Sequence, residues 1–321
     1  MDNENEIAIK REMQAILFSL AELKPLFENK SITDIWVCNG QVSIKKFGKP
    51  REDVNLILSN QQAKNILVQI AKHIGLDINY DIYPVLEGTI PHYDARITGV
   101  VKKWSKTPYI TIRKRPEIIY SLDDYVTNNQ LTLEQATKIK KFIKDRKNIL
   151  VSGGTNTGKT TFTNAILKQM AEYFPNDSFF IVEDNPELQC KAKYAELLTI
   201  DTDDAMRVIK LALRSSPDRI VFGEIRDGKV LWALLDAWNT GHPGGVSTIH
   251  ANSAEGTFLR MRTLLQQAFG IVQSVNNLVD IIIHISKSPK TGIFIDEIIE
   301  TSDYTDSQIE EIAKLSIESE A

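Results

Sequence analysis

Residues 151–161, VSGGTNTGKTT, are the stretch of this sequence that decides the fold. They contain the spacing Gly-x-x-x-x-Gly-Lys-Thr of a phosphate-binding loop, from Gly153 to Thr160. An apolar run ending at Val151 predicts a buried strand before the loop, and the run from Phe162 predicts a helix after it. Glycines let successive backbone N–H groups point at one anion, and the helix dipole adds positive potential there. The stretch therefore predicts a site for ATP or GTP.

The loop supplies most of the expected nucleotide contacts. Lys159 carries a charge to the terminal phosphates, and the Thr160 hydroxyl is the expected ligand of a magnesium ion. ATP and Mg²⁺ are the expected cofactors. The residues expected to bind them are Gly153, Gly154, Thr155, Asn156, Thr157, Gly158, Lys159, Thr160 and Thr161.

Three later residues lie at the ends of predicted strands, where ligands of α/β proteins bind. Glu183 ends an apolar run and could orient water, although a solvated charge cluster would give the same pattern. Glu224 ends another run and could align water or join the magnesium shell, partly through water; the alternative is a helix cap. His250 follows a glycine-rich stretch, and taken alone it is more often structural.

Strands and helices alternate after residue 130, which predicts an α/β fold with a mostly parallel sheet covered on both faces. A capping box of Thr132 and Gln135 opens the first helix, which runs to about Asp145. The expected strands are 148–152, 178–183, 197–200, 219–225 and 246–250, and the expected helices are 159–172, 203–215, 228–239 and 253–269. β-like segments, 281–283 and 292–299, follow.

The first third of the chain predicts a smaller α+β domain without a nucleotide motif. Its expected elements are an amphipathic helix over 6–29 that Pro25 kinks or ends, a hairpin over 32–47 turning at Asn39-Gly40, a helix over 60–74, and strands over 94–101 and 109–113. We expect an N-terminal domain over 1–115, a linker over 116–130, and a phosphate-loop domain over 131–321. The acidic residues after about 301 are expected to form a mobile tail.

Composition excludes several classes of protein. The 321 residues carry a net charge of −4 and two cysteines, which supports neither a disulfide framework nor a four-cysteine zinc site. No apolar run approaches the roughly 20 residues that cross a bilayer, and the acidic N-terminus is unlike a signal peptide. The basic clusters 102–106 and 113–115 are read as solvated strand ends, so no direct nucleic-acid binding is expected.

Four motifs in this order resemble those of the secretion traffic ATPases. They correspond to that family's Walker A loop (151–161), Asp box (181–188, IVEDNPEL), atypical Walker B (217–227, PDRIVFGEIRD) and His box (244–253, GGVSTIHANS). The resemblance is closest to the TrbB-like conjugative-transfer and type IV secretion branch, whose opening hairpin is similar to residues 34–40, DIWVCNG. It implies a RecA-like P-loop NTPase domain in a ring, expected to be a hexamer.

The resemblance also implies roles for single residues. Glu224 would be the principal catalytic acid, Glu183 a second acid near the attacking water, and His250 a sensor of the terminal phosphate. Arginines of the N-terminal domain would reach the nucleotide, although surface arginines on exposed strands would look the same. The implied catalytic residues are Lys159, Glu183, Glu224, His250, Arg113 and Arg96.

The implied activity is ATP hydrolysis that energises a conjugation or type IV secretion apparatus for DNA or protein transfer or pilus biogenesis. Such a protein would be cytoplasmic and held at the inner membrane by partner proteins of the secretion machinery. Two alternatives stay open: a pilus retraction motor of the same superfamily, and a recombinase-like DNA-dependent ATPase. ATPase stimulation by single-stranded DNA would favour the second.

Overall fold

The structure is a computed structural model that describes residues 2–46, 49–76, 84–101, 104–115, 118–270, 275, 278–288 and 292–318. Packing divides the chain into two compact units, Met1–Ile118 and Ile119–Ala321. Within the described ranges, no helix combines the length and the apolar character that crossing a bilayer requires.

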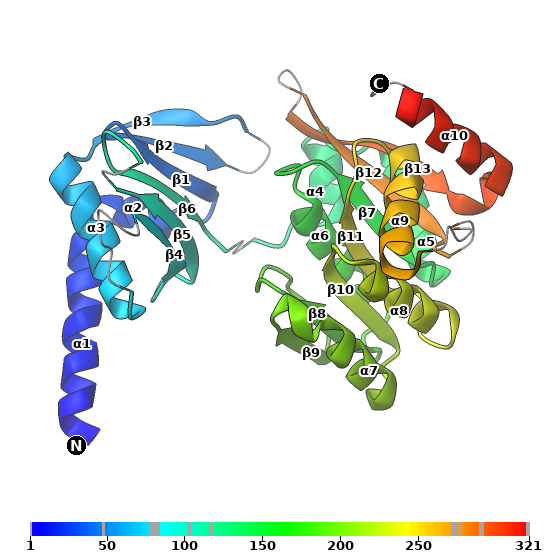
Figure 1. The fold of residues 1–321 in the computed structure, drawn as a ribbon, viewed down its shortest axis with the longest axis horizontal. Coiled ribbons are helices and arrows are strands. Elements are labelled where there is room, and N and C mark those ends of the chain that lie inside the picture. Colours follow the sequence, from blue (N-terminus) through cyan, green and yellow to red (C-terminus); the bar gives the residue numbers. More distant parts are fainter. Residues whose placement is uncertain are drawn as a thin grey trace. The chain divides into compact units, whose positions relative to one another are not determined.

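The N-terminal unit is a six-stranded sheet packed against helices (Figure 1). Its strand order is β3-β2-β1-β6-β5-β4, and all neighbouring strands are antiparallel. Helices α1 and α3 contact each other, and apolar side chains from them and from the strands form one core. The elements are α1 (Asp2–Ser19), η1 (Ala21–Leu23), α2 (Lys24–Glu28), β1 (Ile32–Cys38), β2 (Gln41–Lys46), β3 (Glu52–Ile57), α3 (Asn60–His73), β4 (Val85–Ile90), β5 (Ala95–Val100) and β6 (Tyr109–Arg113).

The structure confirms the predicted hairpin, because Asn39 and Gly40 turn with positive φ angles of 51° and 81°. The prediction of a single helix over 6–29 is wrong in detail, since α1 ends at Ser19 and two short helices, η1 and α2, follow it. Pro25 lies in the first turn of α2, where its missing N–H would be unpaired in any case, so it starts a helix rather than ending one. Strands β3 and β4 were not predicted. The apolar side chains of β3 are half-exposed or exposed, and in β4 Gly88 interrupts the alternation between the buried Leu86 and Ile90.

The C-terminal unit carries the remaining elements (Figure 1). Their bounds are α4 (Leu122–Thr127), α5 (Leu133–Lys144), β7 (Ile149–Gly153), α6 (Lys159–Tyr173), β8 (Ser178–Glu183), β9 (Tyr194–Thr199), η2 (Thr202–Asp204), α7 (Ala205–Ser215), β10 (Arg219–Ile225), α8 (Gly228–Asn239), β11 (Val246–His250), α9 (Ala254–Phe269), β12 (Ile281–Ser288), β13 (Gly292–Glu300), η3 (Thr301–Asp303) and α10 (Asp306–Glu318). The predicted alternation of strands and helices is confirmed.

The seven strands of this unit form one sheet in the order β13-β12-β7-β11-β10-β8-β9. Every neighbouring pair is parallel except β12 and β13, which confirms the mostly parallel α/β sheet. A core of buried side chains joins one face of the sheet to α7, α8 and α9. Helix α6 contacts β7 and β11, and α4 and α5 pack beside it (Figure 1). Strands buried on both faces read as continuous apolar runs, as β7 and β8 do.

Strand order decides which side chains can meet. The strands β7, β11, β10 and β8 are consecutive neighbours and run in parallel, so their carboxyl ends share one edge of the sheet. Gly153, His250, Glu224 and Glu183 lie at or next to those four ends. The fold therefore gathers the four sequence motifs at one place.

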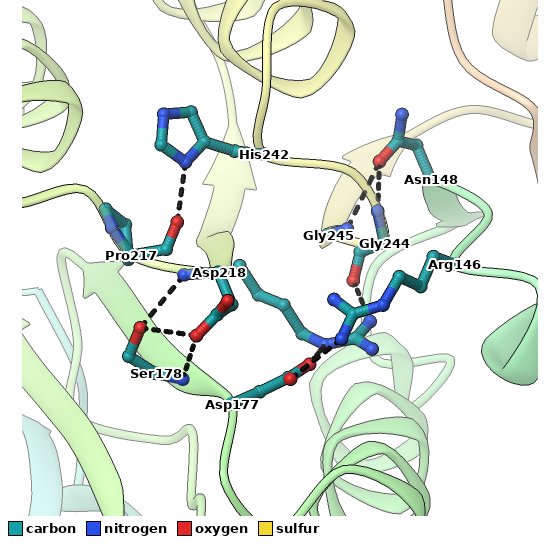
Figure 2. Close-up of polar contacts among 10 residues, drawn as sticks. Arg146, Asn148, Asp177, Ser178, Pro217, Asp218, His242, Gly244 and Gly245 are labelled. Atoms are coloured by element: carbon teal, nitrogen blue, oxygen red, sulfur yellow. Dashed lines mark hydrogen bonds and ion pairs between the residues drawn. The ribbon is translucent and has the colours of Figure 1, made fainter.

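A buried polar cluster ties the amino ends of the same strands (Figure 2). The Asn148 side-chain oxygen accepts the N–H groups of Gly244 and Gly245 at 2.8 and 3.2 Å. The Arg219 guanidinium, which is 0% exposed, donates to Asp177 Oδ2 at 2.8 Å and to the Gly244 carbonyl at 2.6 Å. The two glycines of the His box therefore pack at the edge opposite the phosphate-binding loop.

Two segments of the C-terminal part contain helices that the sequence did not predict. The proposed linker 116–130 contains helix α4, which Ser121 and Asp124 cap reciprocally and whose Tyr125 packs edge-on against Phe162 at 5.1 Å. The segment after 301, expected to be a mobile tail, contains helix α10, which continues to Glu318 and buries Ile309 against the core; its mobility stays a prediction. Both segments are amphipathic, so their polar composition hid a short apolar stripe.

Candidate nucleotide site

The phosphate-binding loop joins a buried strand to a helix, as its sequence predicts. Strand β7 is buried throughout and ends at Gly153, and α6 starts at Lys159 after Gly158 in the left-handed region, φ 84°. A Cβ atom on Gly153 would lie 2.5 Å from the Ile285 carbonyl oxygen and 2.7 Å from Thr157 Oγ1. Only glycine fits there, and the turn leaves a backbone cradle at the helix N-terminus, which suits an anion.

Lys159 lies folded into this cradle. Its ammonium donates to the carbonyl oxygens of Gly153 and Gly154 at 3.0 and 2.9 Å and lies 3.2 Å from His250 Nδ1. Burial, opposed by the Glu224 charge and assisted by the Arg226 charge, lowers the pKa of Lys159 to about 8. The charge is therefore held at the place where phosphate oxygens would arrive.

His250 connects Lys159 to Glu224. Its Nδ1 faces the Lys159 ammonium, and its Nε2 lies 2.9 Å from Glu224 Oε1. An ammonium only donates and a carboxylate only accepts, so Nδ1 is the acceptor and Nε2–H the donor, as in a neutral imidazole. Burial and the Lys159 charge lower the pKa of His250, which favours this neutral form. Polar contacts thus connect Lys159, His250 and Glu224 in series, and each residue comes from a different sequence motif.

Glu224 is held from its other side by Arg226. Arg226 Nη2 donates to Glu224 Oε2 at 2.7 Å, and Nη1 donates to Asp184. Burial by itself would raise the pKa of Glu224, but the hydrogen bond and charge of Arg226, with His250 and Lys159, bring it below its ordinary value. Glu224 is therefore ionised at neutral pH.

Glu183 occupies a different environment from Glu224. It is 3% exposed, and its Oε2 accepts the backbone N–H groups of Glu187 and Leu188 at 2.9 and 2.8 Å. Asn164 of α6 holds the same loop, since its side chain donates to the Glu187 carbonyl at 3.0 Å. The structure thus gives Glu183 a part in shaping the loop after β8, and the expected role beside attacking water stays a prediction.

The residues expected around a metal lie at the same edge. Thr160 is the second residue of α6, directly after Lys159. Glu224 is the penultimate residue of β10. No cluster of three or more His, Cys, Asp and Glu side chains among the described residues forms a metal cage. The glycine cradle and one hydroxyl fit Mg²⁺ that arrives with phosphates and keeps most of its water.

Arg96 and Arg113 lie in the other unit. They stand opposite each other on the paired strands β5 and β6, and Arg113 Nε lies 3.4 Å from Asp34 Oδ1. Their proposed contact with nucleotide stays a prediction.

A few polar contacts near the site were not predicted from the sequence. Asp184 and Arg226 lie within the Asp box and the atypical Walker B, and Arg226 donates to both Asp184 and Glu224. Ser152, one residue before the loop, bonds His284 of β12 across 3.0 Å within the sheet. His284 sits in a β-strand 132 residues away, so no local sequence signal points to the pair.

Comparisons with known proteins identify the relatives of this chain. Residues 85–312 match the family described as Type II/IV secretion system protein. The chain is 37% identical over 256 residues to a probable conjugal transfer protein TrbB of Sinorhizobium fredii, covering 79% of this chain and 78% of the relative. It is 41% identical over 227 residues to a conjugal transfer protein TrbB of Rhizobium radiobacter, covering 70% of each.

Among solved structures, the ATPase DotB of Legionella pneumophila has the same fold. Its TM-score is 0.64 at 16% identity, with 94% of this chain and 88% of that chain covered. The chain therefore belongs to the type II/IV secretion system protein family, in its TrbB-like conjugative-transfer branch.

Proposed function

We propose that this protein is a ring-forming ATPase that binds Mg·ATP at residues 153–161 and energises a conjugation or type IV secretion apparatus. The observation that carries the proposal is the chain of contacts from Lys159 through His250 to Glu224 beside an anion cradle. A cation, a relay and an ionised carboxylate around one cradle suit phosphoryl transfer to water.

Each residue has a separate part in the proposed reaction. The backbone N–H groups of the loop bind the phosphates, and Lys159 leaves the Gly153 and Gly154 carbonyls for the terminal phosphate. Glu224 orients the attacking water and accepts its proton. When Lys159 moves to the terminal phosphate, His250 loses its contact with Lys159, so the state of His250 depends on whether that phosphate is bound. Thr160 and Glu224 would hold Mg²⁺, partly through water. The ion would neutralise charge on the phosphate oxygens.

Arg96 and Arg113 would complete the site from the N-terminal unit. They are direct cross-strand neighbours on β5 and β6, beside Asp34 of β1. Charge on a transferred phosphoryl group is well matched by planar guanidinium groups. ATP would draw the two units together, and phosphate release would let them separate.

The family supports a proposal for the assembly and its partners. The proposed form is a homohexameric ring, cytoplasmic, held at the inner membrane by components of the secretion machinery. The conjugal-transfer names of the relatives favour export over pilus retraction. A DNA-dependent ATPase is disfavoured by the acidic net charge of −4.

Light scattering coupled to size-exclusion, run with and without Mg·ATP beside a phosphate-release assay, tests the proposal. We expect a ring of several subunits that hydrolyses ATP, and loss of both nucleotide binding and hydrolysis in Lys159→Ala. A matched exposed variant, Lys210→Ala on α7, should behave as the wild type. Normal turnover by Lys159→Ala would refute the site, and turnover only with single-stranded DNA would favour the DNA-dependent alternative.

A further inference from the structure

Arg226 links carboxylates at the ends of two neighbouring strands. Its Nη2 donates to Glu224 Oε2 at 2.7 Å, and its Nη1 donates to Asp184 Oδ2. Glu224 belongs to β10, and Asp184 directly follows β8, which pairs with β10 in parallel. One guanidinium therefore spans the edge of the sheet beside the proposed nucleotide site.

The backbone around Arg226 is fixed on both sides. The preceding residue, Ile225, is the last residue of β10 and is buried. Asp227 after it caps α8, accepting the N–H groups of Lys229 and Val230 at 2.8 and 3.2 Å. Because the position of its Cα is fixed in this way, the conformation of the Arg226 side chain alone decides which groups it contacts.

The surroundings offer the guanidinium few other acceptors. A pocket lies beside it, and most of its other lining is apolar: Ile200, Ala205, Phe222 and Val230. Asp227 also lines the pocket, but its Oδ1 is engaged in the helix cap. Asp184 and Glu224 are therefore the acceptors that define where the guanidinium lies.

This contact sets the rotation of the Glu224 carboxylate. Oε2 is taken by Arg226, whereas Oε1 lies 2.9 Å from His250 Nε2, on the side of Lys159 and the phosphate-binding loop. The planar, multidentate guanidinium holds a carboxylate in one orientation better than an ammonium would. Oε1 is thus the oxygen that faces the site.

Stability alone gives little reason for the arrangement. The Arg226 side chain is 48% exposed, and ion pairs of exposed side chains contribute little to the free energy of unfolding. An orienting contact next to a catalytic group has a larger effect, because small misplacements of that group slow the reaction strongly.

We propose that Arg226 is a positioning residue for Glu224, anchored by Asp184, and that it presents Oε1 to the attacking water. The inference rests on the proposed ATPase function, and it adds residues and an atom to the reaction. Arg226 touches neither phosphate nor water; it acts through the carboxylate of Glu224.

Steady-state kinetics of Arg226→Gln, Arg226→Lys and Asp184→Asn test the proposal. We expect Arg226→Gln to lower kcat about 10- to 100-fold, with KM and the Kd of a fluorescent ATP analogue within about threefold of wild type. Arg226→Lys should recover part of kcat, since lysine restores the positive charge but not the planar, two-pronged donor geometry of the guanidinium. The double variant Arg226→Gln/Asp184→Asn should be no slower than Arg226→Gln alone, because Asp184 acts through Arg226.

Arg207→Gln is the matched control. Arg207 lies on α7, is 88% exposed and pairs with Asp204 at 4.0 Å, so its kcat and melting temperature should equal those of wild type. An unchanged kcat in Arg226→Gln would overturn the proposal, as would a fall in nucleotide affinity equal to the fall in kcat.

Crystal structures of wild type and Arg226→Gln give a readout that needs no turnover. The proposal expects the Glu224 carboxylate to leave its position only in the variant, and an unmoved carboxylate in Arg226→Gln contradicts it. If the wild type hydrolyses no ATP, the proposed function fails, and these two structures still decide whether Arg226 positions Glu224.

Discussion

Replacing Asp177 with asparagine is expected to destabilise the C-terminal unit strongly. One Asp177 carboxylate faces two guanidinium groups: Oδ2 accepts from Arg219 Nε at 2.8 Å, and Oδ1 accepts from Arg146 Nη2 at 2.8 Å (Figure 2). Arg219 is 0% exposed and stacks 4.5 Å from the centre of the Phe174 ring. Asparagine would leave this buried charge without its counter-ion.

The size of the effect follows from that burial. Removing one partner of a buried ion pair costs about 3–5 kcal/mol, because the remaining charge cannot be solvated. For a unit of this length, each kcal/mol lowers the melting temperature by roughly 2–4 °C, so we expect a loss of roughly 6–20 °C. Arg219→Met should cost less, about 1–3 kcal/mol, because it removes the buried charge itself and Asp177 keeps Arg146 as its counter-ion. The Gly244 carbonyl and Asp177 Oδ2 lose a donor.

Urea unfolding followed by tryptophan fluorescence, to which Trp238 contributes together with the other three tryptophans, measures both losses. Trp238 is buried in the same unit, and its Nε1 donates to the Ile220 carbonyl at 2.9 Å, one residue from Arg219. Asp123→Asn is the matched control: Asp123 is 70% exposed and pairs with Lys140 at 2.7 Å, so its loss should stay below about 1 kcal/mol. An Asp177→Asn protein within about 1 kcal/mol of wild type would refute the reasoning.

Two further predictions concern the nucleotide loop and the His box. Because burial lowers the pKa of Lys159 to about 8, its ammonium is present below pH 8 and lost above it. Calorimetry should show the Kd of the wild type for ATP without Mg²⁺ rising about tenfold from pH 8 to pH 9.5, relative to any change in the Kd of Lys159→Arg over the same range. Parallel plots of Kd against pH for the two proteins would contradict this. A Cβ atom on Gly245 would lie 2.1 Å from Trp238 Nε1 and 2.4 Å from the Ile220 carbonyl oxygen. Gly245→Ala should therefore lower the free energy of unfolding by about 1–3 kcal/mol in urea titrations, and an unchanged midpoint would show that the strand moves aside.

The phosphate-binding edge was predictable because each motif ends a continuous apolar run. Parallel strands buried on both faces have that pattern, and their carboxyl ends share one edge. Glu224 and His250 could therefore be placed near Lys159 before any contact was known. The contacts themselves, such as His250 Nε2 to Glu224 Oε1, depend on the strand order β7-β11-β10.

Other features depend on partners that local sequence does not reveal. The loop amides that engage Glu183 form only after the chain turns at 184–188. Arg226 finds Asp184 at a separation of 42 residues, through the pairing of β8 with β10. Helix α4 was missed because its cap pairs Ser121 with Asp124, whereas the capping box is usually recognised by Glu or Gln.

The central claim is that Glu224 activates water for a nucleotide held by the loop at 153–161. Phosphate release and ATP binding, measured side by side for wild type and Glu224→Gln, test it most directly. We expect the variant to bind ATP within about threefold of wild-type affinity while hydrolysing it at least about 100-fold more slowly. Hydrolysis by Glu224→Gln at the wild-type rate would contradict the account.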